Sequence, residues 1–416
     1  MIMYRNKLSY GLPRELWLVQ VGIFLNTFGW GAVLPFEVIY LHEGRGLGLR
    51  TAGLIVGTLT GAAVVAAPLA GRLIDRVGAR VTSVVAGSAL AAGYCGLAFA
   101  HSAGPAFAAA VVGGAGNGAL SPAQTTLLVT LTRREYRHRA TAVSRVCTNA
   151  GFGLGGAAGG IFAAHGVNGY VALFLLNAAT YLAYVVVLVT CVRREEPVER
   201  IAGGYGRVLR DGAFVRLALA NVAVIGVGWG VLPWVVPPYA TAILHIGPKL
   251  IGLLMLANAA TVVLLQVPVA RLAEGQRRVV MMATGSLVFA ASCLFVLTAR
   301  ELGTGALVVA SVAIGVGECL HAAALGPLVA ELAPAGLRGR YQAGIGLSWW
   351  LGLALAPTVG TQLLSVSASL TFGAFAVAAA CASASLLGLD RRLPAEARRT
   401  PRTVIAIRRG GVSVRD

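Results

Sequence analysis

Apolar runs of roughly 20 residues recur along the whole chain, and short segments rich in charge, glycine or proline separate them. An α-helix of roughly 20 apolar residues crosses a bilayer core about 30 Å thick, and lipid offers the backbone no other hydrogen-bond partners. The first-half runs predict spanning helices at 17–41, 51–71, 82–100, 106–129, 141–164 and 170–192. The second-half runs predict them at 217–243, 250–270, 279–298, 305–329, 341–364 and 369–388. We expect an all-α polytopic membrane protein with twelve transmembrane helices.

Composition agrees with this interpretation and excludes several function classes. The chain is 57% hydrophobic and only 12% charged, which is too apolar for a soluble globular protein. Its six cysteines lie in or beside apolar runs without a C-x-x-C pair, as small buried hydrophobes do. The polar segments are too short for a catalytic domain and contain neither a phosphate-binding loop nor a nucleophile constellation. We therefore expect no enzyme activity, no cofactor and no metal site.

The net charge of +18 is distributed unevenly between the two sides of the membrane. With the N-terminus inside, all but five of the 34 Lys and Arg fall in cytoplasmic loops and tails. The exceptions are Arg45, Arg50, Lys249 and Arg300 outside, and Arg145 in or near a span. This asymmetry follows the positive-inside rule, so no nucleic-acid partner is needed to explain the charge. We expect a multi-pass protein of the inner (plasma) membrane with both termini cytoplasmic.

The two sets of spans are related by an internal repeat. Residues 29–35 read GWGAVLP, and residues 228–233 read GWGVLP. Gly48, Arg50, Gly53 and Leu54 recur as Gly247, Lys249, Gly252 and Leu253, a constant shift of 199. A duplicated six-helix unit with parallel halves is typical of transporters that rock about a site at the bilayer midplane. The expected organisation is a six-helix bundle at 1–192, a cytoplasmic linker at 193–216, a second pseudo-symmetric six-helix bundle at 217–388 and a basic cytoplasmic tail at 389–416.

Residues 71–80 form a charged island, GRLIDRVGAR, between two apolar runs. This segment resembles the G-x-L-x-D-R-x-G-x-R loop between helices 2 and 3 of the major facilitator superfamily. The resemblance implies alternating access and a cytoplasmic latch between the two halves, formed by Gly71, Asp75, Arg76, Gly78 and Arg80. Glycines would let the chain turn sharply and Asp75 would accept hydrogen bonds, although an ordinary solvated turn remains the other interpretation. The repeat-related copy at 271–278 keeps an acid and several bases but loses the glycine spacing.

A glycine-rich stretch in the fifth span narrows the resemblance to the drug:proton antiporters. Residues 151–160, GFGLGGAAGG, are similar to the antiporter motif g-x-x-x-G-P-x-x-G-G, with Gly156 in place of the proline. The matching positions are Gly151, Gly155, Gly159 and Gly160. An arginine that these antiporters carry in their fourth span has no counterpart at 109–112. Glycines at this spacing also allow close helix packing, which is the alternative interpretation.

Two acidic residues within the spans are candidates for proton coupling. An ionised group at mid-span costs roughly 2.5–3.5 kcal/mol, and such groups usually serve function. Glu318 lies near the middle of the tenth span, with His321 three residues later on the same face. The pair fits proton relay, and a structural pairing of Glu318 with His321 that ties the helix to a neighbour is the alternative interpretation. Glu37 follows Pro35 in the first span and is the second candidate, unless it reaches outer water.

The expected substrate cavity has aromatic walls near the kinked parts of the first and seventh spans. Its candidate residues are Trp30, Phe36, Trp229, Trp234 and Tyr239, with Asn117 as the repeat-related partner of Glu318. Aromatic rings with one or two acids fit a lipophilic, cationic solute through stacking and cation–π contacts. Anchoring at the membrane interface is the competing role for some of these rings. Arg145 stands a few residues into its span and can extend to the interface.

Together these features predict a monomeric secondary transporter that exports a small lipophilic or amphiphilic solute in exchange for protons. Its partners are then the solute, protons and the lipid bilayer. A symporter or facilitator that imports a nutrient such as a sugar or an organic acid is the nearest alternative, although its cavity would need more polar groups. A membrane receptor built on a transporter scaffold is a third.

Overall fold

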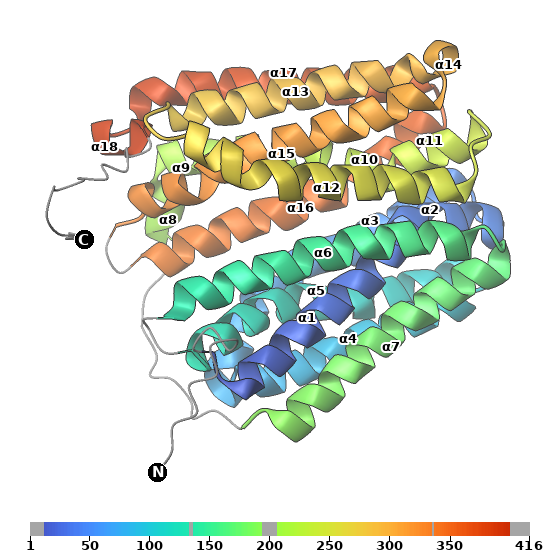
Figure 1. The fold of residues 1–416 in the computed structure, drawn as a ribbon, viewed down its shortest axis with the longest axis horizontal. Coiled ribbons are helices and arrows are strands. Elements are labelled where there is room, and N and C mark those ends of the chain that lie inside the picture. The colour runs from blue at the N-terminus through green and yellow to red at the C-terminus, as the bar shows by residue number, and fades with distance from the viewer. Residues whose placement is uncertain (1–11, 133–135, 194–205, 335–336, 400–416) are drawn as a thin grey trace, which may run out of the picture.

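The computed structural model describes residues 12–132, 136–193, 206–334 and 337–399. Helices account for nearly all of these residues, and they pack side by side as two neighbouring bundles (Figure 1). The helix α1 begins, and α17 ends, at the same end of the molecule, which lies on the left of Figure 1 and is called the terminal end below. The opposite end is called the far end.

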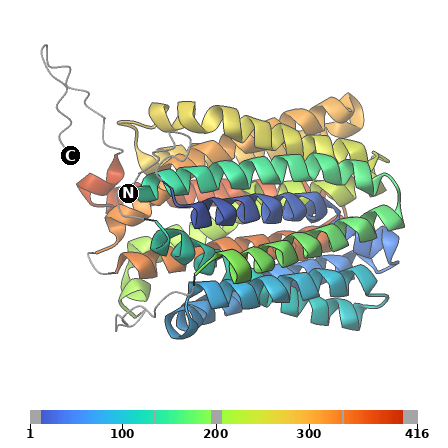
Figure 2. The same ribbon diagram turned by 60° about the horizontal axis from the view of Figure 1, so that its bottom comes forward.

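The N-terminal bundle contains six spanning segments. They are α1 (Arg14–Val33) continued by η2 (Leu34–Phe36), α2 (Glu37–Ile39) and η3 (Tyr40–Gly44), then α3 (Leu49–Val77), α4 (Ala79–Phe99), α5 (Ala103–Thr130), α6 (Arg137–Ala163) and α7 (Val167–Cys191). Figure 2 shows α1 lying between α6 and α7, and it packs closely against both.

The C-terminal bundle repeats this arrangement. Its spans are α9 (Gly212–Gly228) continued by α10 (Val231–Trp234) and α11 (Val236–Ala242), then α12 (Pro248–Leu272), α13 (Arg278–Leu297), α15 (Thr304–Leu332), α16 (Arg338–Leu364) and α17 (Ala368–Leu389). Four short helices lie at the ends of the bundle: α8 (Gly206–Arg210), α14 (Ala299–Leu302), η5 (Asp390–Arg392) and α18 (Ala395–Arg398). The expectation of an all-α fold with twelve spans in two six-helix bundles is confirmed.

Most of these spans are long and apolar enough to cross a bilayer on their own. Nine described helical segments pass this criterion, and α9 with α10 and α11 makes a tenth. The other two long helices, α5 and α6, are diluted by glycine, asparagine and hydroxyl residues. Those two helices must therefore gain part of their stability in the membrane from contacts with other helices.

The first span of each half is broken at a proline. Pro35 lacks an N–H and cannot continue the α-helical hydrogen bonds, so the chain passes through a 3₁₀ turn after Val33. In the second half, α9 stops at Gly228, and the segment containing Pro233, Pro237 and Pro238 leaves it at an angle of 40°. Breaks of this kind are tolerated within a membrane where protein covers the freed backbone groups.

The two halves have largely separate hydrophobic cores and meet along two helix pairs, α3 with α16 and α6 with α12. A Cβ added at Gly252 of α12 would lie 3.0 Å from the Cα of Gly160 in α6, so these backbones touch. On the other seam, Arg50 Nε donates to Ser365 Oγ at 2.8 Å and Gln362 Nε2 donates to the Arg50 carbonyl at 3.1 Å. Both sets of contacts lie toward the far end, which is therefore the end where the halves are fastened together.

Candidate functional site

A cavity of about 220 Å³ lies between the two halves, next to the broken first spans. Both halves contribute to it through α1, η2, α6, α9, α10, α12, α15 and α16. Its lining residues are Trp30, Leu34, Thr148, Asn149, Phe152, Gly228, Trp229, Leu232, Pro233, Trp234, Met255, Asn258, Ala259, Val262, Glu318, Trp349 and Leu353. We call it the central cavity.

Aromatic rings form much of the wall of the central cavity. Trp30 meets Phe152 edge to face, with ring centroids 5.7 Å apart, on the N-terminal side. On the C-terminal side Trp229 packs against Trp349 at 5.1 Å. Of the six residues predicted from the sequence for the substrate cavity, Trp30, Trp229 and Trp234 line it. Such rings present flat apolar faces with negative quadrupoles, which suit a lipophilic or cationic guest.

Glu318 is the one charged side chain among the described residues that line the central cavity. It lies on α15, and Asn258 Nδ2 of α12 donates a hydrogen bond to its Oε1 at 3.1 Å. No cationic side chain among the described residues pairs with this carboxylate. A carboxylate in apolar surroundings is costly unless a proton or another cation neutralises it. This site can therefore bind either one.

His321 does not pair with Glu318. It is buried one layer behind the cavity wall, where its ring meets Trp229 edge to face at 5.6 Å. Its Nε2 donates to Asn221 Oδ1 at 2.9 Å, while the Asn221 amide donates to Ser348 Oγ at 2.8 Å. The helical spacing places both residues on one side of α15, but their side chains contact different neighbouring helices.

Glu37 is buried at the far end and joins the two halves. Tyr94 of α4 donates its hydroxyl to Glu37 Oε1 at 3.1 Å, and Trp234 of α10 donates Nε1 to Glu37 Oε2 at 2.9 Å. The sequence left open whether Glu37 reaches outer water, and the structure places it out of contact with solvent. Because Trp234 also lines the central cavity, it connects the cavity with Glu37.

Three other predicted cavity residues lie elsewhere. Phe36 packs on Tyr170 at 6.0 Å and Tyr239 packs on Phe372 at 5.1 Å, both fully buried within their own halves. Each residue directly follows a proline, and its ring faces the last span of its own half, which accounts for its distance from the cavity wall. Asn117 is half-buried on α5, which contributes no residue to the central cavity.

A second, polar cavity of about 280 Å³ lies between α1, α5 and α6, and we call it the vestibule. Its lining residues are Ile23, Ser121, Gln124, Thr125, Leu128, Ser144, Arg145, Thr148 and Asn149. Thr148 and Asn149 also line the central cavity, so the two spaces adjoin. Arg145 stands one helical turn from Asn149, toward the terminal end.

The loop at 71–80 differs from the expected sharp turn. The helix α3 continues through Val77, and only Gly78 leaves it, with a left-handed φ of 86°. Gly71 lies within the helix, where an added Cβ would meet no atom within 4 Å. The segment stays helical because nothing before Gly78 requires a positive φ. The side chain of Asp75 lies outside the described part of the structure, and Arg76 is exposed.

Arg80 is bound within its own half. Its Nε and Nη2 donate to the carbonyls of Leu188 and Val189, both at 2.7 Å, near the C-terminal end of α7. Carbonyls in the last turn of a helix have no partner in that helix, and a cation there also complements the helix dipole. In this conformation Arg80 thus fastens the α3–α4 loop to α7.

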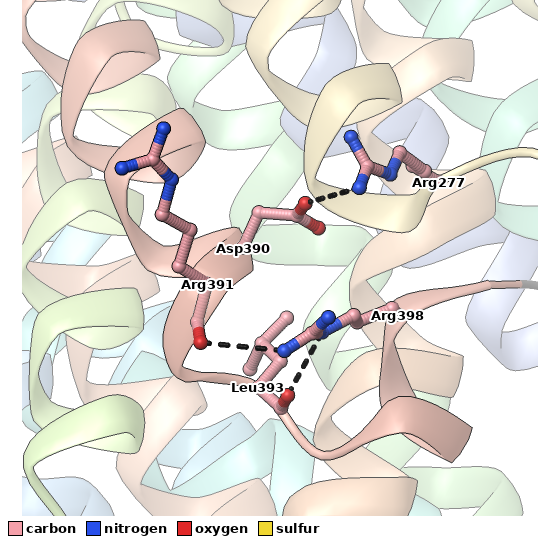
Figure 3. A network of polar contacts seen from close by, with 5 residues as sticks. All are labelled: Arg277, Asp390, Arg391, Leu393 and Arg398. Atoms are coloured by element: carbon pink, nitrogen blue, oxygen red, sulfur yellow. Dashed lines mark hydrogen bonds and ion pairs between the residues drawn. The ribbon is translucent and has the colours of Figure 1, made fainter.

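The repeat-related loop is fastened in a similar way. Arg277 Nη2 lies 3.2 Å from Asp390 Oδ2, directly after α17 (Figure 3). Arg398 of α18 folds back and donates to the carbonyls of Leu393 and Arg391, at 3.0 and 3.3 Å. In each half, an arginine of the loop between the second and third spans therefore holds the end of the sixth span.

The glycines of α6 serve two packing faces. Gly151, Gly155 and Gly159 face α1, where an added Cβ would meet backbone atoms of 24–32. Gly160 faces Pro248 and Gly252 of α12, in the other half. The predicted antiporter-like set therefore divides between packing within one half and contact between the halves.

Several cavity residues escaped sequence analysis. Asn258 is an amide inside an apolar run, which is a usable signal, whereas Phe152, Trp349 and Asn149 resemble ordinary core or interface residues. Among the described residues, no group of three His, Cys, Asp or Glu side chains is placed to hold a metal ion.

Comparison with known proteins gives matches along nearly the whole chain. The family model described as Major Facilitator Superfamily matches residues 21–225 and 217–412. The Uncharacterized MFS-type transporter YttB of Bacillus subtilis (strain 168) is 27% identical over 363 residues, covering 85% of this chain and 89% of that protein. YqjV, with the same description and organism, is 23% identical over 353 residues, covering 83% and 85%.

Solved structures show the same fold at low identity. A peptide transporter POT in complex with sulfate has a TM-score of 0.75 and 16% identity, covering 96% of this chain and 100% of that chain. A POT family transporter in complex with 5-aminolevulinic acid has a TM-score of 0.76 and 13% identity, covering 91% and 96%. At such identities the likeness extends to the fold alone.

Proposed function

Because this chain belongs to the Major Facilitator Superfamily, we propose that it is a proton-coupled exporter of small lipophilic or amphiphilic solutes, cations above all. Family membership makes it a multi-pass membrane transporter. The solute class, the direction and the proton are the parts that we propose.

The observation that carries the proposal is the single carboxylate in an aromatic cavity. Glu318 is the one charged residue among the described residues that line the central cavity, and four tryptophans line the same cavity. An organic cation would gain from both the carboxylate and the ring faces. When that cation leaves, a proton is the simplest replacement that avoids an isolated charge in low dielectric. Competition between solute and proton for Glu318 would couple the two fluxes.

The proposed cycle is alternating access in a monomer of the plasma membrane, with both termini in the cytoplasm. In this orientation the described conformation is fastened at the outer end, where Trp234 bonds Glu37 and α3 packs on α16. Solute would enter from the vestibule and displace the proton at Glu318. The halves would then part at the outer end and release the solute in exchange for an external proton.

The loops that follow α3 and α12 remain gating elements in this proposal. Arg80 and Arg277 hold them to the ends of α7 and α17, so each loop moves with its own bundle as a rigid edge. The two loops would meet at the cytoplasmic end when the outer end opens. The roles of Asp75 and Arg76 as latch residues belong to that second conformation.

Transport by the purified protein in proteoliposomes tests the proposal. We expect a pH gradient to drive movement of ethidium, a lipophilic cation, and Glu318→Gln to lower the driven rate at least about tenfold, because the neutral amide cannot exchange a proton. Glu301→Gln is the matched control, since Glu301 lies in the short helix α14 at the far end. Undiminished driven transport by Glu318→Gln would remove Glu318 from the mechanism.

The polar vestibule favours one second candidate, import of an anionic nutrient such as an organic acid. Its lining includes Arg145 of α6. Hydroxyl and amide groups come from Ser121, Gln124 and Thr125 of α5 and from Ser144, Thr148 and Asn149 of α6. Running the same vesicles in the opposite direction with organic acids separates the two functions. Proton-driven uptake of an acid, with no movement of ethidium, would favour the importer.

A further inference from the structure

The geometry points to a water-filled proton route inside the N-terminal half, which connects Glu37 with the vestibule and bypasses the central cavity. This inference deepens the proposed function and rests on it for its physiological meaning. From the far end to the terminal end, the members of the route are Glu37, Tyr94, Asn177, Asn26, Tyr184 and Gln124.

The route starts at a carboxyl group that cannot meet bulk water directly. Glu37 is buried, and its two oxygens accept hydrogen bonds from Tyr94 and Trp234. The titratable groups that face it are Tyr94 of α4 and Tyr181 of α7, and the ring of Tyr181 stacks on that of Tyr94 at 6.2 Å. Among the described residues of the other half, the Trp234 indole is the hydrogen-bond partner of Glu37. A proton that leaves Glu37 therefore needs a path through the N-terminal bundle.

From Tyr94 the route continues to α7. Its hydroxyl contacts Glu37, and the side chain of Asn177 lies beside the same hydroxyl. Both amide atoms of Asn177 are buried, and neither has a hydrogen-bond partner of good geometry. A buried amide that lies beside a hydroxyl and lacks partners of its own is a place where water is held.

The middle of the route is the seam between α1 and α7. Gly22, Asn26 and Gly29 fall on one face of α1 by their helical spacing. A Cβ added at Gly29 would lie 2.8 Å from Asn177 Oδ1, and one added at Gly22 would overlap the Tyr184 ring. Asn26 therefore lies between Asn177 and Tyr184 along the seam. Its amide nitrogen and oxygen are both buried without a partner.

The route ends in the vestibule. The Tyr184 hydroxyl is buried without a hydrogen bond of good geometry, and the side chain of Gln124 lies next to it. Gln124 lines the vestibule on α5. In the proposed orientation the vestibule leads to the cytoplasm.

Water held along the route would give its buried polar atoms the hydrogen-bond partners that they lack. Asn26, Asn177 and Tyr184 place five buried polar atoms without a hydrogen bond of good geometry along one helix seam, where apolar side chains would pack at lower cost. A buried water molecule typically makes about three hydrogen bonds to such groups. Waters bridging these atoms would form a continuous hydrogen-bonded chain from the Tyr94 hydroxyl to Gln124.

Proton movement along this chain balances without another reactant. The Tyr94 hydroxyl first turns its O–H from Glu37 to the next water, so that its oxygen can accept from the carboxylic acid. Glu37 then gives its proton to the Tyr94 oxygen, and Tyr94 gives its own proton to that water. Each water repeats the exchange until one hydronium ion leaves at the vestibule. The net change is one carboxylate at Glu37 and one proton in the vestibule, while Glu318 stays available to the solute.

Infrared spectroscopy on the full chain in lipid nanodiscs tests the route without any solute. The carboxylic-acid C=O band that Glu37→Gln removes reports the protonated Glu37, and its shift in D₂O reports how fast that proton exchanges. We expect Tyr184→Phe, which deletes a single hydroxyl, to slow this exchange about tenfold or more. Asn26→Leu should have a similar effect. The control is Tyr40→Phe, whose hydroxyl bonds the Ala98 carbonyl and Arg45 near Glu37 but lies off the route.

The exchange rates of these variants decide whether the route exists. Slow exchange in Tyr184→Phe and Asn26→Leu, with wild-type exchange in Tyr40→Phe, supports the route. Equal exchange in all of these variants overturns it and leaves the polar seam as packing alone, as does the absence of any band sensitive to Glu37→Gln. Ethidium counterflow without a pH gradient checks that the variants fold. If wild-type protein couples no protons to solute, the proposed function fails, while the exchange rates still answer whether the route exists.

Discussion

At the scale of single residues, the two membrane acids occupy different environments. Glu318 faces the cavity with one amide partner, whereas Glu37 is enclosed and receives one hydrogen bond from each half. Trp234 belongs to both environments, because its ring lines the cavity and its N–H binds Glu37. A solute that moves this ring also disturbs a contact that keeps the far end closed.

Trp234→Phe isolates that contact, since it keeps an aromatic ring and removes the N–H. A hydrogen bond of this kind contributes about 0.5–1.5 kcal/mol, so its loss should favour the conformation open at the far end. We expect maleimide to label Thr358→Cys, placed on the far-end seam of a variant without native cysteines, up to about tenfold faster. Trp349→Phe, on another wall of the cavity, is the control. Equal labelling in the two backgrounds would show that the Trp234 N–H does not hold the seam.

At the scale of helices, close contact between α6 and α12 depends on the absence of side chains. A Cβ at Gly252 would lie 2.7 Å from the Gly156 carbonyl oxygen and 3.0 Å from the Gly160 Cα, and a backbone gives way less easily than a side chain. Overpacking of this kind typically costs about 1–3 kcal/mol. The strain falls on the seam between the halves, since each bundle is held by other contacts.

We therefore expect Gly252→Ala to lower the thermal unfolding midpoint in detergent and to shift the protein toward opening at the far end. Gly305→Ala is the matched control, because an added Cβ there would meet no atom within 4 Å. The measurement is the unfolding midpoint together with labelling of the far-end seam. Unchanged labelling in Gly252→Ala would mean that the seam relaxes around the new methyl group.

At the scale of the whole molecule, transport requires the two bundles to separate at the far end. A Cβ added at Gly57 of α3 would lie 3.2 Å from the Thr358 Cβ of α16, near the roughly 3.5–4.5 Å that a disulfide joins. The paired change Gly57→Cys and Thr358→Cys in a variant without native cysteines should abolish ethidium transport when oxidised. A reductant should restore it.

The control disulfide lies within one bundle. A Cβ added at Gly315 would lie 3.0 Å from the Thr261 Cβ, and both residues belong to the C-terminal half. Oxidation of Gly315→Cys with Thr261→Cys should leave most of the transport intact. Full activity of the oxidised Gly57 and Thr358 pair would contradict rigid-body alternating access about this seam.

The sequence was sufficient to predict the twelve spans and the duplication, because apolar length and repeated motifs carry that information directly. It also singled out Glu318 and three tryptophans as site candidates, and the structure brings them to one cavity. Their roles in coupling and solute binding stay predictions. The sequence could not place Phe36 and Tyr239, since helical spacing gives a face but neighbouring helices determine how that face is rotated. The bond of His321 to Asn221 joins residues 100 positions apart, and no local pattern encodes it.

The low apolarity of α5 and α6 has a consequence for biogenesis. A helix too polar to partition into lipid alone must enter the membrane alongside partners that cover its glycines. The partners of α5 are α3 and α4, which the ribosome has already delivered. One face of α6 can settle on α1 at once, but the other rests on α12, which is translated only after the linker. The face of α6 that packs on α12 therefore stays uncovered during synthesis. The N-terminal bundle reaches its final packing only when the C-terminal bundle has been made.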